Sequence, residues 1–129
     1  MLEQIQKAEQ ALKLELGKTD LTVWPVNTAS DAYKLGLFYG ITLSWPGDEK
    51  VIKNQIETVR TITERVAQEK QLKPNYDGPT MAAGGALVVY CGFETPLLEA
   101  ATQKARGQNK PIWIVCKEDP ELIELAKSA

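Results

Sequence analysis

The 129-residue chain contains no histidine, and this absence removes several classes of catalytic and metal-binding site. Ser-His-Asp and Cys-His catalysis within one chain both need an imidazole base, and histidine is a common metal ligand. Cys91 and Cys116 are the only cysteines, and their spacing supports neither a thioredoxin-like CxxC motif nor a zinc knuckle. Both lie in apolar runs, where we expect buried, reduced thiols. The sequence therefore predicts no metal and no cofactor.

Long apolar runs and an excess of one charge are also missing. No stretch approaches the roughly 20 apolar residues that span a bilayer, and the polar start MLEQIQKAEQ is unlike a signal peptide. The 15 basic and 17 acidic residues leave a net charge of -2, which disfavours duplex nucleic acid as a partner. We expect one cytoplasmic domain of residues 1–129 without membrane contact, since this length suffices for one hydrophobic core.

Hydrophobic periodicity and turn residues predict alternating helices and strands. Helices are expected at 2–16, 27–43, 48–71, 96–106 and 120–127, and strands at 21–26, 86–90 and 112–116. The last two strands are apolar throughout, which is typical of a parallel sheet covered on both faces. The predicted fold is a small three-layer α/β/α domain with a short, mainly parallel, Rossmann-like sheet and one long helix. The segment 73–85, rich in proline and glycine, reads as a mobile loop, and a fourth strand near 80–83 stays open.

The segment 48–71 is the longest predicted helix. Its apolar stripe is core, a dimer seam, or both. Opposite charges four residues apart surround the stripe and predict a solvated face; the pairs are Glu49/Lys53, Lys53/Glu57, Arg60/Glu64 and Arg65/Glu69. Such a helix would span roughly 36 Å, about the width expected of the whole domain, so part of it is available to pair with another subunit.

Two similar turns follow the strands predicted at 86–90 and 112–116. In each, a capping residue (Thr95 or Asp119) precedes a proline at the first helical position, where the missing N–H has no consequence. Capping accounts for Thr95 but leaves Gly92, Phe93 and Glu94 unexplained. The carboxyl ends of parallel strands are where open α/β sheets bind ligands. A carboxylate there suits ribose hydroxyls or a general base, whereas a solvated glutamate in a capping turn is the structural alternative.

Residues 85–116 resemble the late βαβ unit of the nucleoside deoxyribosyltransferases and the "lonely guy" (lysine-decarboxylase-like) phosphoribohydrolases. The matching positions are Gly92, Thr95, Glu99 and Lys110-Pro111. The resemblance implies a Rossmann-like fold, a nucleotide or nucleoside ligand, chemistry at an N-glycosidic bond, and oligomers. The sequence departs from the family in the spacing from Thr95 to Glu99, in lacking the doubled glycine of the phosphoribohydrolase turn, and in having no glycine-rich phosphate loop after the first strand.

Two functions follow from these observations. The first is a protein that binds a nucleotide, nucleoside or sugar phosphate, with hydrolysis or transfer at an N-glycosidic bond as the implied reaction. Glu94 or Glu99 would be the catalytic carboxylate. The ligand-binding residues would be Asn27, Thr28, Ser30, Asp31, Gly92, Thr95 and Asp77, the last from a loop able to close over the site. The alternative is a non-catalytic regulatory or adaptor protein that homodimerises through the 48–71 helix, with Trp45 and Tyr76 as partner contacts.

Overall fold

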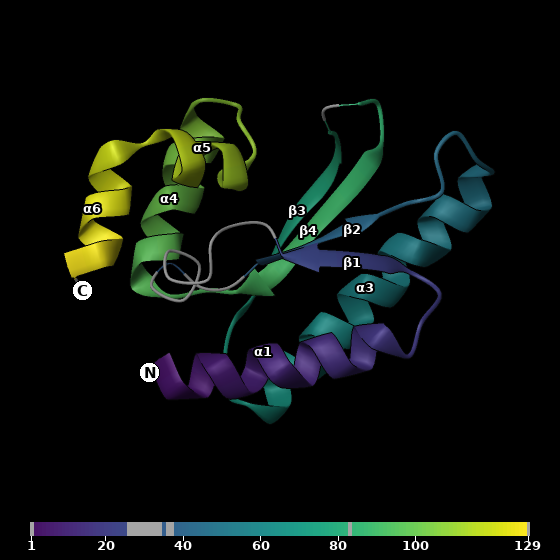
Figure 1. The fold of residues 1–129 in the computed structure, drawn as a ribbon, viewed down its shortest axis with the longest axis horizontal. Helices are drawn as coiled ribbons and strands as arrows, with labels where there is room; N and C mark the ends of the chain where they lie inside the picture. The colour runs from purple at the N-terminus through teal and green to yellow at the C-terminus, as the bar shows by residue number, and fades with distance from the viewer. Residues whose placement is uncertain (1, 26–34, 36–37, 83, 129) are drawn as a thin grey trace.

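The computed structural model describes residues 2–25, 35, 38–82 and 84–128, and places helices on both faces of a four-stranded sheet (Figure 1). The described elements are α1 (Leu2–Gly17), β1 (Thr22–Pro25), β2 (Phe38–Thr42), α3 (Glu49–Glu69), β3 (Pro74–Met81), β4 (Leu87–Phe93), α4 (Pro96–Gly107), α5 (Ile112–Glu118) and α6 (Pro120–Ser128). In this part of the chain, no helix is both long enough and apolar enough to cross a membrane.

The sheet is antiparallel, so the predicted parallel, Rossmann-like sheet is wrong. Its order is β1-β2-β4-β3, and each neighbouring pair runs in opposite directions. Strands β3 and β4 are consecutive and form a hairpin. The predicted pairing of strands 86–90 and 112–116 in one parallel sheet is also wrong, because the described elements after β4 are helices. The presence of both helices and strands and the covering of the sheet by helices on both faces (Figure 1) agree with the prediction, whereas the direction of the strands does not.

The apolar run Ile112–Cys116, which was predicted to be a strand, begins helix α5. Its buried residues are Ile112, Val115 and Cys116, and they pack in one cluster with α4. Val115 and Cys116 follow Ile112 by three and four residues. In a helix, residues at this spacing lie on one face, whereas in a strand Val115 and Cys116 would point to opposite faces. Because short apolar runs are compatible with either structure, the choice depends on the surface they cover.

The end of the predicted helix 27–43 is strand β2. Phe38–Thr42 is rich in aromatic and β-branched residues, which favour strands. Tyr39 and Ile41 face one side of the sheet and are buried. Gly40 pairs with Trp24 of β1, whose ring lies where a side chain at position 40 would stand. Gly40, which lies within the helix predicted at 27–43, is therefore part of a strand.

Strand β3 occupies most of the segment that was expected to be a loop. It is an edge strand, and its register against β4 shifts between Asp77 and Thr80, where Gly78 and Pro79 interrupt the ladder. A bulge of this kind at an edge limits pairing with other chains and tolerates a proline. β3 is the fourth strand that the sequence left open, although it starts six residues earlier than the expected 80. Pro25 is the last residue of β1, the other edge strand, where a proline is tolerated.

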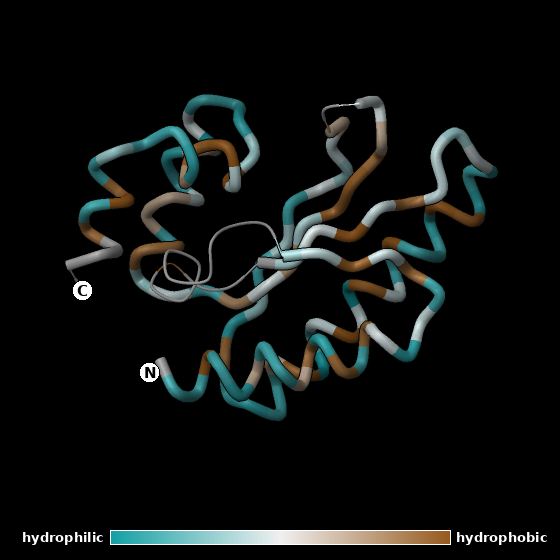
Figure 2. The backbone as a smooth tube through the Cα atoms, viewed as in Figure 1, coloured by the Kyte–Doolittle hydropathy of each residue, from teal (hydrophilic) through white to brown (hydrophobic). Residues whose placement is uncertain are grey.

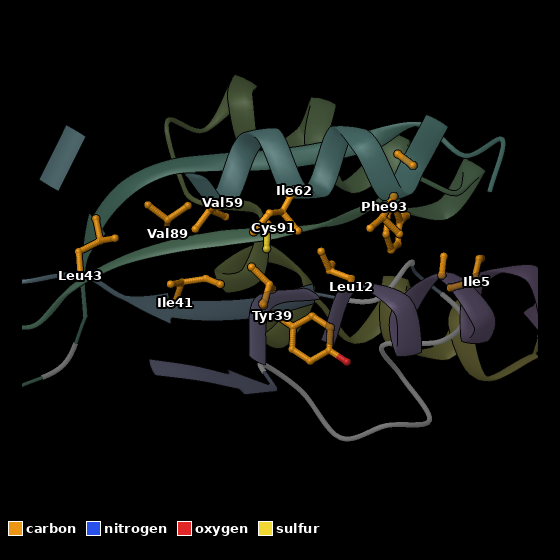
Figure 3. Packing of buried hydrophobic residues seen from close by; sticks show 14 residues of the cluster. Ile5, Leu12, Tyr39, Ile41, Leu43, Val59, Ile62, Val89, Cys91 and Phe93 are labelled. Carbon is orange, nitrogen blue, oxygen red and sulfur yellow. The ribbon is translucent and has the colours of Figure 1, made fainter. Parts of the chain in front are cut away.

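Two hydrophobic clusters fill the space between the three layers. On one face, Tyr39, Ile41, Val89, Cys91 and Phe93 pack against α1 and α3, as Figure 3 shows at close range. On the other face, Val88 and Tyr90 pack against α4 and α5. Successive residues of β4 thus point alternately into one cluster and the other. Figure 2 shows apolar residues along the strands. The predicted helices at 2–16, 48–71, 96–106 and 120–127 are confirmed as α1, α3, α4 and α6.

Candidate functional site

The residues predicted to bind a ligand after strand 86–90 are part of the packed structure. Gly92 is buried within β4 and lies between Phe38 of β2 and Asn75 of β3. Thr95 is buried at the start of α4, where its hydroxyl accepts from the Leu98 N–H (3.2 Å) and donates to the Leu35 carbonyl (2.6 Å). The predicted capping role of Thr95 is confirmed. The four residues Asn27, Thr28, Ser30 and Asp31 lie outside the described residues.

Glu94 contacts the start of β3 through both oxygens of its carboxylate. One oxygen accepts from Asn75 Nδ2 at 2.8 Å, and the other pairs with Lys73 Nζ at 3.1 Å. The Asn75 amide also donates to the Thr102 hydroxyl of α4 at 3.3 Å. Because this carboxylate ties the start of β3 to the end of β4, its observed role is structural. Glu99 is exposed on α4, and no hydrogen bond or ion pair joins it to Glu94 among the described residues.

Asp77 lies in strand β3 and not in a mobile loop. Its carboxylate accepts a hydrogen bond from the backbone N–H of Ile112 at 2.9 Å. Burial raises the pKa of this carboxyl, while the Ile112 N–H and the charge of Arg106 lower it less strongly. Glu94, Thr95, Asp77 and Gly92 thus each take part in contacts that hold the fold.

Metal and thiol chemistry have no visible site in the described part of the chain. No group of three or more acidic or cysteine side chains is placed to hold a metal ion there. Both cysteines are free and buried, as predicted. Burial raises the pKa of Cys91 to about 12 and that of Cys116 to about 11, so neither is a ready nucleophile.

The outer face of α3 is the surface with the most distinctive composition. Val51, Asn54, Thr58 and Thr61 are exposed and recur at spacings of three and four, so they form one row along the helix; we call this row the α3 outer stripe. Apart from Gln68, every other exposed residue of α3 is charged. The apolar stripe on the opposite side is buried against the sheet and α1. The apolar stripe is therefore core, and the row left open to a partner is uncharged.

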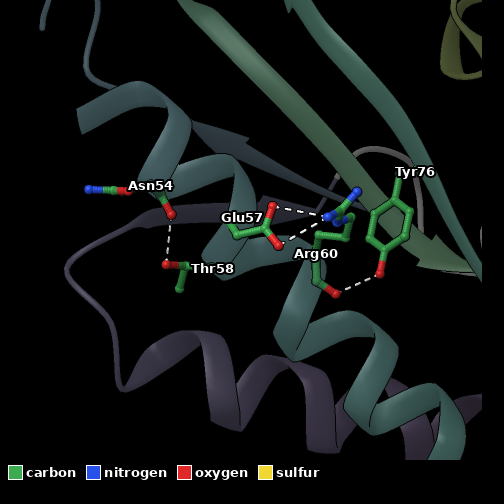
Figure 4. A network of polar contacts seen from close by, with 5 residues as sticks. All are labelled: Asn54, Glu57, Thr58, Arg60 and Tyr76. Atoms are coloured by element: carbon green, nitrogen blue, oxygen red, sulfur yellow. Dashed lines mark hydrogen bonds and ion pairs between the residues drawn. The ribbon is translucent and has the colours of Figure 1, made fainter. Parts of the chain in front are cut away.

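Ion pairs line one side of the α3 outer stripe. Glu49 pairs with Lys53 at 3.5 Å, as predicted, whereas Arg60 pairs with Glu57 at 3.0 Å. Figure 4 shows Glu57 and Arg60 beside Tyr76 of β3, whose hydroxyl donates to the Arg60 carbonyl at 2.6 Å. Tyr76 is thereby occupied in holding β3 to α3, although it was predicted as a partner contact.

Two shallow hollows flank the α3 outer stripe, and both are bordered by Asn54 and Thr58. One, of about 290 Å³, lies towards the turn after α1 and is also lined by Leu21, Val51 and Gln55. The other, of about 340 Å³, is also lined by Thr61 and Ile62. Asn54 and Thr58 therefore form a ridge between two grooves, the surface shape by which helices pack on one another.

A half-exposed tryptophan lies just before α3. Trp45 is 50% exposed, in the turn between β2 and α3. Its neighbour Ser44 is held to the helix by Gln55, which accepts from the Ser44 N–H and donates to the Ser44 hydroxyl, each at 3.0 Å. Asp48 then caps the helix by accepting from the Lys50 N–H. The turn that carries Trp45 is thus fixed relative to the α3 outer stripe.

The sequence contains a signal for this surface. Between residues 51 and 61, Asn54, Thr58 and Thr61 recur with Val51 at helical spacing away from the buried apolar positions, and Arg65 continues this row one turn later. The prediction treated the whole face outside the apolar stripe as one solvated surface, and it therefore missed this row. Comparison with protein-family models, with curated proteins and with solved structures finds no match to this chain.

Proposed function

We propose that this chain is a non-catalytic interaction protein, of the regulatory or adaptor kind, that binds another polypeptide through the outer face of α3. The observation that carries the proposal is the α3 outer stripe, an exposed uncharged row on a helix whose other exposed positions are nearly all charged. Charged residues are depleted at the centres of protein interfaces, whereas surfaces that only face solvent do not need such a row.

Trp45 and the two grooves support the same proposal. Tryptophan is enriched among the residues that dominate binding energy, and Trp45 is carried on a turn already fixed by Gln55. A fixed turn loses little conformational freedom on binding, so more of the contact energy appears as affinity. The grooves beside Asn54 and Thr58 offer places for the ridges of a partner helix.

The binding of a nucleotide, nucleoside or sugar phosphate stays a prediction. It depended on a parallel sheet edge, and the strands are antiparallel. Thermal-shift measurements with these three ligand classes compare it with the interaction proposal. We expect no shift in melting temperature. A saturable shift of several degrees that Glu99→Ala removes would favour the ligand-binding alternative, because Glu99 is exposed and its loss leaves the core intact.

Site-specific photo-crosslinking tests the interaction proposal directly. A photoreactive amino acid replaces Asn54 in the α3 outer stripe or, as a matched control, Gln103, which is exposed on α4. We expect polypeptide adducts from position 54 and few from position 103. Adding Thr58→Arg should remove the adducts, because it introduces a charge into the ridge. Equal adduct yields from positions 54 and 103 would contradict the proposal.

A further inference from the structure

We infer that the polypeptide bound by the α3 outer stripe is a second copy of this chain. The two α3 helices would be antiparallel and would cross at the level of Ile56 along the helix axis, although the Ile56 side chain itself faces the core. This inference rests on the proposed function and names its partner. Three properties of the described helix support it: the spacing of the stripe, the hydrogen-bonding groups along it, and the charges beside it.

The spacing of the stripe is symmetric about Ile56. Asn54 and Thr58 lie two residues on either side of this position, and Val51 and Thr61 lie five residues on either side. Consider an antiparallel pair whose two-fold axis passes between the helices at the level of Ile56. Asn54 then faces Thr58 of the second copy, and Val51 faces its Thr61. A two-fold interface requires one surface to complement itself, and a row with this spacing does so.

The central residues of the stripe also complement each other chemically. The Thr58 hydroxyl donates its proton to the Asn54 carbonyl of its own helix at 2.8 Å, so its oxygen is left as an acceptor (Figure 4). The Asn54 side chain has two N–H donors and points away from that bond in the same view. An Asn54 amide can therefore donate to Thr58 of the second copy, and the two-fold axis repeats the bond. Neither partner brings a charge that would have to be desolvated.

Opposite charges meet beside the stripe in this arrangement. Lys50 and Glu64 are exposed on the same side of it, and neither is within ion-pair distance of an opposite charge in the described part of the chain, although Glu64 interacts at longer range with Arg60. With a rise of 1.5 Å per residue, Lys50 of one helix lies within about 3 Å, along the axis, of Glu64 of the second copy. The antiparallel pairing thus brings Lys50 and Glu64 of opposite copies together, which a parallel pairing in register would not.

The contact should produce a weak dimer. The paired part of the helix, Val51 to Thr61, is about 15 Å long. Such a contact buries less than the roughly 800 Å² per partner that is typical of stable complexes. We therefore expect a dissociation constant on the order of 10 to 100 µM.

Sedimentation velocity over a range of about 1 µM to 1 mM tests the inference. The wild-type chain should change from monomer to dimer across this range. Thr58→Arg should weaken the dimer at least about tenfold, because two guanidinium groups would meet near the axis. Gln103→Arg adds the same charge to α4 and should leave the association unchanged. Since Thr58 and Gln103 are exposed, circular dichroism should show both variants folded.

Mixing two charged variants tests the register. Asn54→Asp alone should also weaken the dimer. An equimolar mixture of Thr58→Arg and Asn54→Asp should restore it, because the new guanidinium of one chain faces the new carboxylate of the other. Failure of the mixture to associate, when each variant alone is folded and monomeric, would overturn the antiparallel register.

The crosslinking at position 54 separates failure of this inference from failure of the proposed function. Adducts with twice the mass of the chain, together with the concentration-dependent dimer, support the second copy. A chain that stays monomeric at every concentration, but whose position 54 crosslinks to a different polypeptide, overturns the second copy and leaves the interaction function standing. Absence of both dimer and position-specific adducts overturns both proposals.

Discussion

Asp77 of edge strand β3 accepts a hydrogen bond from the backbone N–H of Ile112, the first residue of α5, with 2.9 Å between Oδ2 and N. Pro111 precedes this helix and supplies no capping side chain. Asp77 therefore performs from a distant strand the role that a local N-cap residue performs elsewhere. This contact fixes the position of α5 against the sheet, and it occupies an aspartate that the sequence suggested for ligand binding.

The charge of Asp77 should reduce stability at neutral pH. Burial raises the pKa of this carboxyl, and the opposing effects of the Ile112 N–H and Arg106 are smaller. Tyr90 and Cys116 also interact electrostatically with Asp77, but their own pKa values are raised and they stay neutral at pH 7. Between the unfolded and folded pKa values of Asp77, the folded state binds more protons. Its contribution to stability is therefore lost as the pH rises through that window.

Replacing Asp77 tests this sign. Asp77→Asn keeps an oxygen acceptor for Ile112 and removes the charge, so we expect a more stable protein at pH 7. The advantage should shrink as the pH falls towards 4. Asp77→Ala removes the acceptor and should destabilise by about 1–3 kcal/mol. Urea unfolding at several pH values measures all three proteins, and an advantage of Asp77→Asn that grows on acidification would contradict the interpretation.

Thr95→Val should destabilise the fold although it preserves the shape of the side chain. The Thr95 hydroxyl caps α4 and donates to the Leu35 carbonyl, and the residue is buried. Losing the cap and leaving buried groups unpaired should lower the free energy of unfolding by about 2 kcal/mol. Thr61→Val is the matched control, exposed on α3, and should change it by less than about 0.5 kcal/mol. Equal effects of the two changes in urea unfolding would argue against this role.

Gly40→Ala should be poorly tolerated because of Trp24. A Cβ at position 40 would lie 2.5 Å from Trp24 Cζ2 in the neighbouring strand. The indole is also held by its N–H, which donates to the Thr42 hydroxyl at 3.1 Å. We expect a loss of about 1–3 kcal/mol in thermal or urea unfolding. Gly78→Ala is the control, because no atom outside the adjacent residues lies within 4 Å of the added carbon, and it should have little effect. A loss of stability as large as that of Gly40→Ala would show that the Trp24 contact is not the cause.

The two thiols should be unreactive in the folded protein. Burial raises the pKa values of Cys91 and Cys116 to about 12 and 11, so the thiolate is scarce at pH 8. Ellman's reagent should detect two thiols in urea and almost none in native buffer. Because both pKa values are raised, stability should also fall as the pH rises above about 9. Rapid reaction of one thiol in native buffer would mean that its part of the core opens locally.

Much of the helical structure was predictable because its signals are local. In α3, a buried stripe recurs every three or four residues over 21 residues, and α1 has a similar pattern. Thr95-Pro96 and Asp119-Pro120 mark two helix starts by capping chemistry, and Asp119 accepts from the N–H groups of Glu121 and Leu122. Such features need no information about distant parts of the chain.

The candidate surface was predictable only in part. The sequence indicated that the helix at 48–71 could meet another subunit, but it left open whether its apolar stripe was core or seam. The structure buries Val59, Ile62 and Val66 against the sheet, which leaves the uncharged outer row as the surface for a partner. The predicted ligand site depended on strands that run parallel, and no local pattern around Glu94 reveals their direction.

The sequence by itself determined the long helices, the caps, the burial of both cysteines and the presence of both helices and strands. Only the tertiary structure decided that Phe38–Thr42 is a strand, that Ile112–Cys116 is helical, and that the sheet is antiparallel. The physical reason is that a run of about five apolar residues is buried equally well in a strand or in a helix. Backbone hydrogen bonds from β1 and β4 select the strand for Phe38–Thr42, while α4 and the Asp77 carboxylate select the helix for Ile112–Cys116.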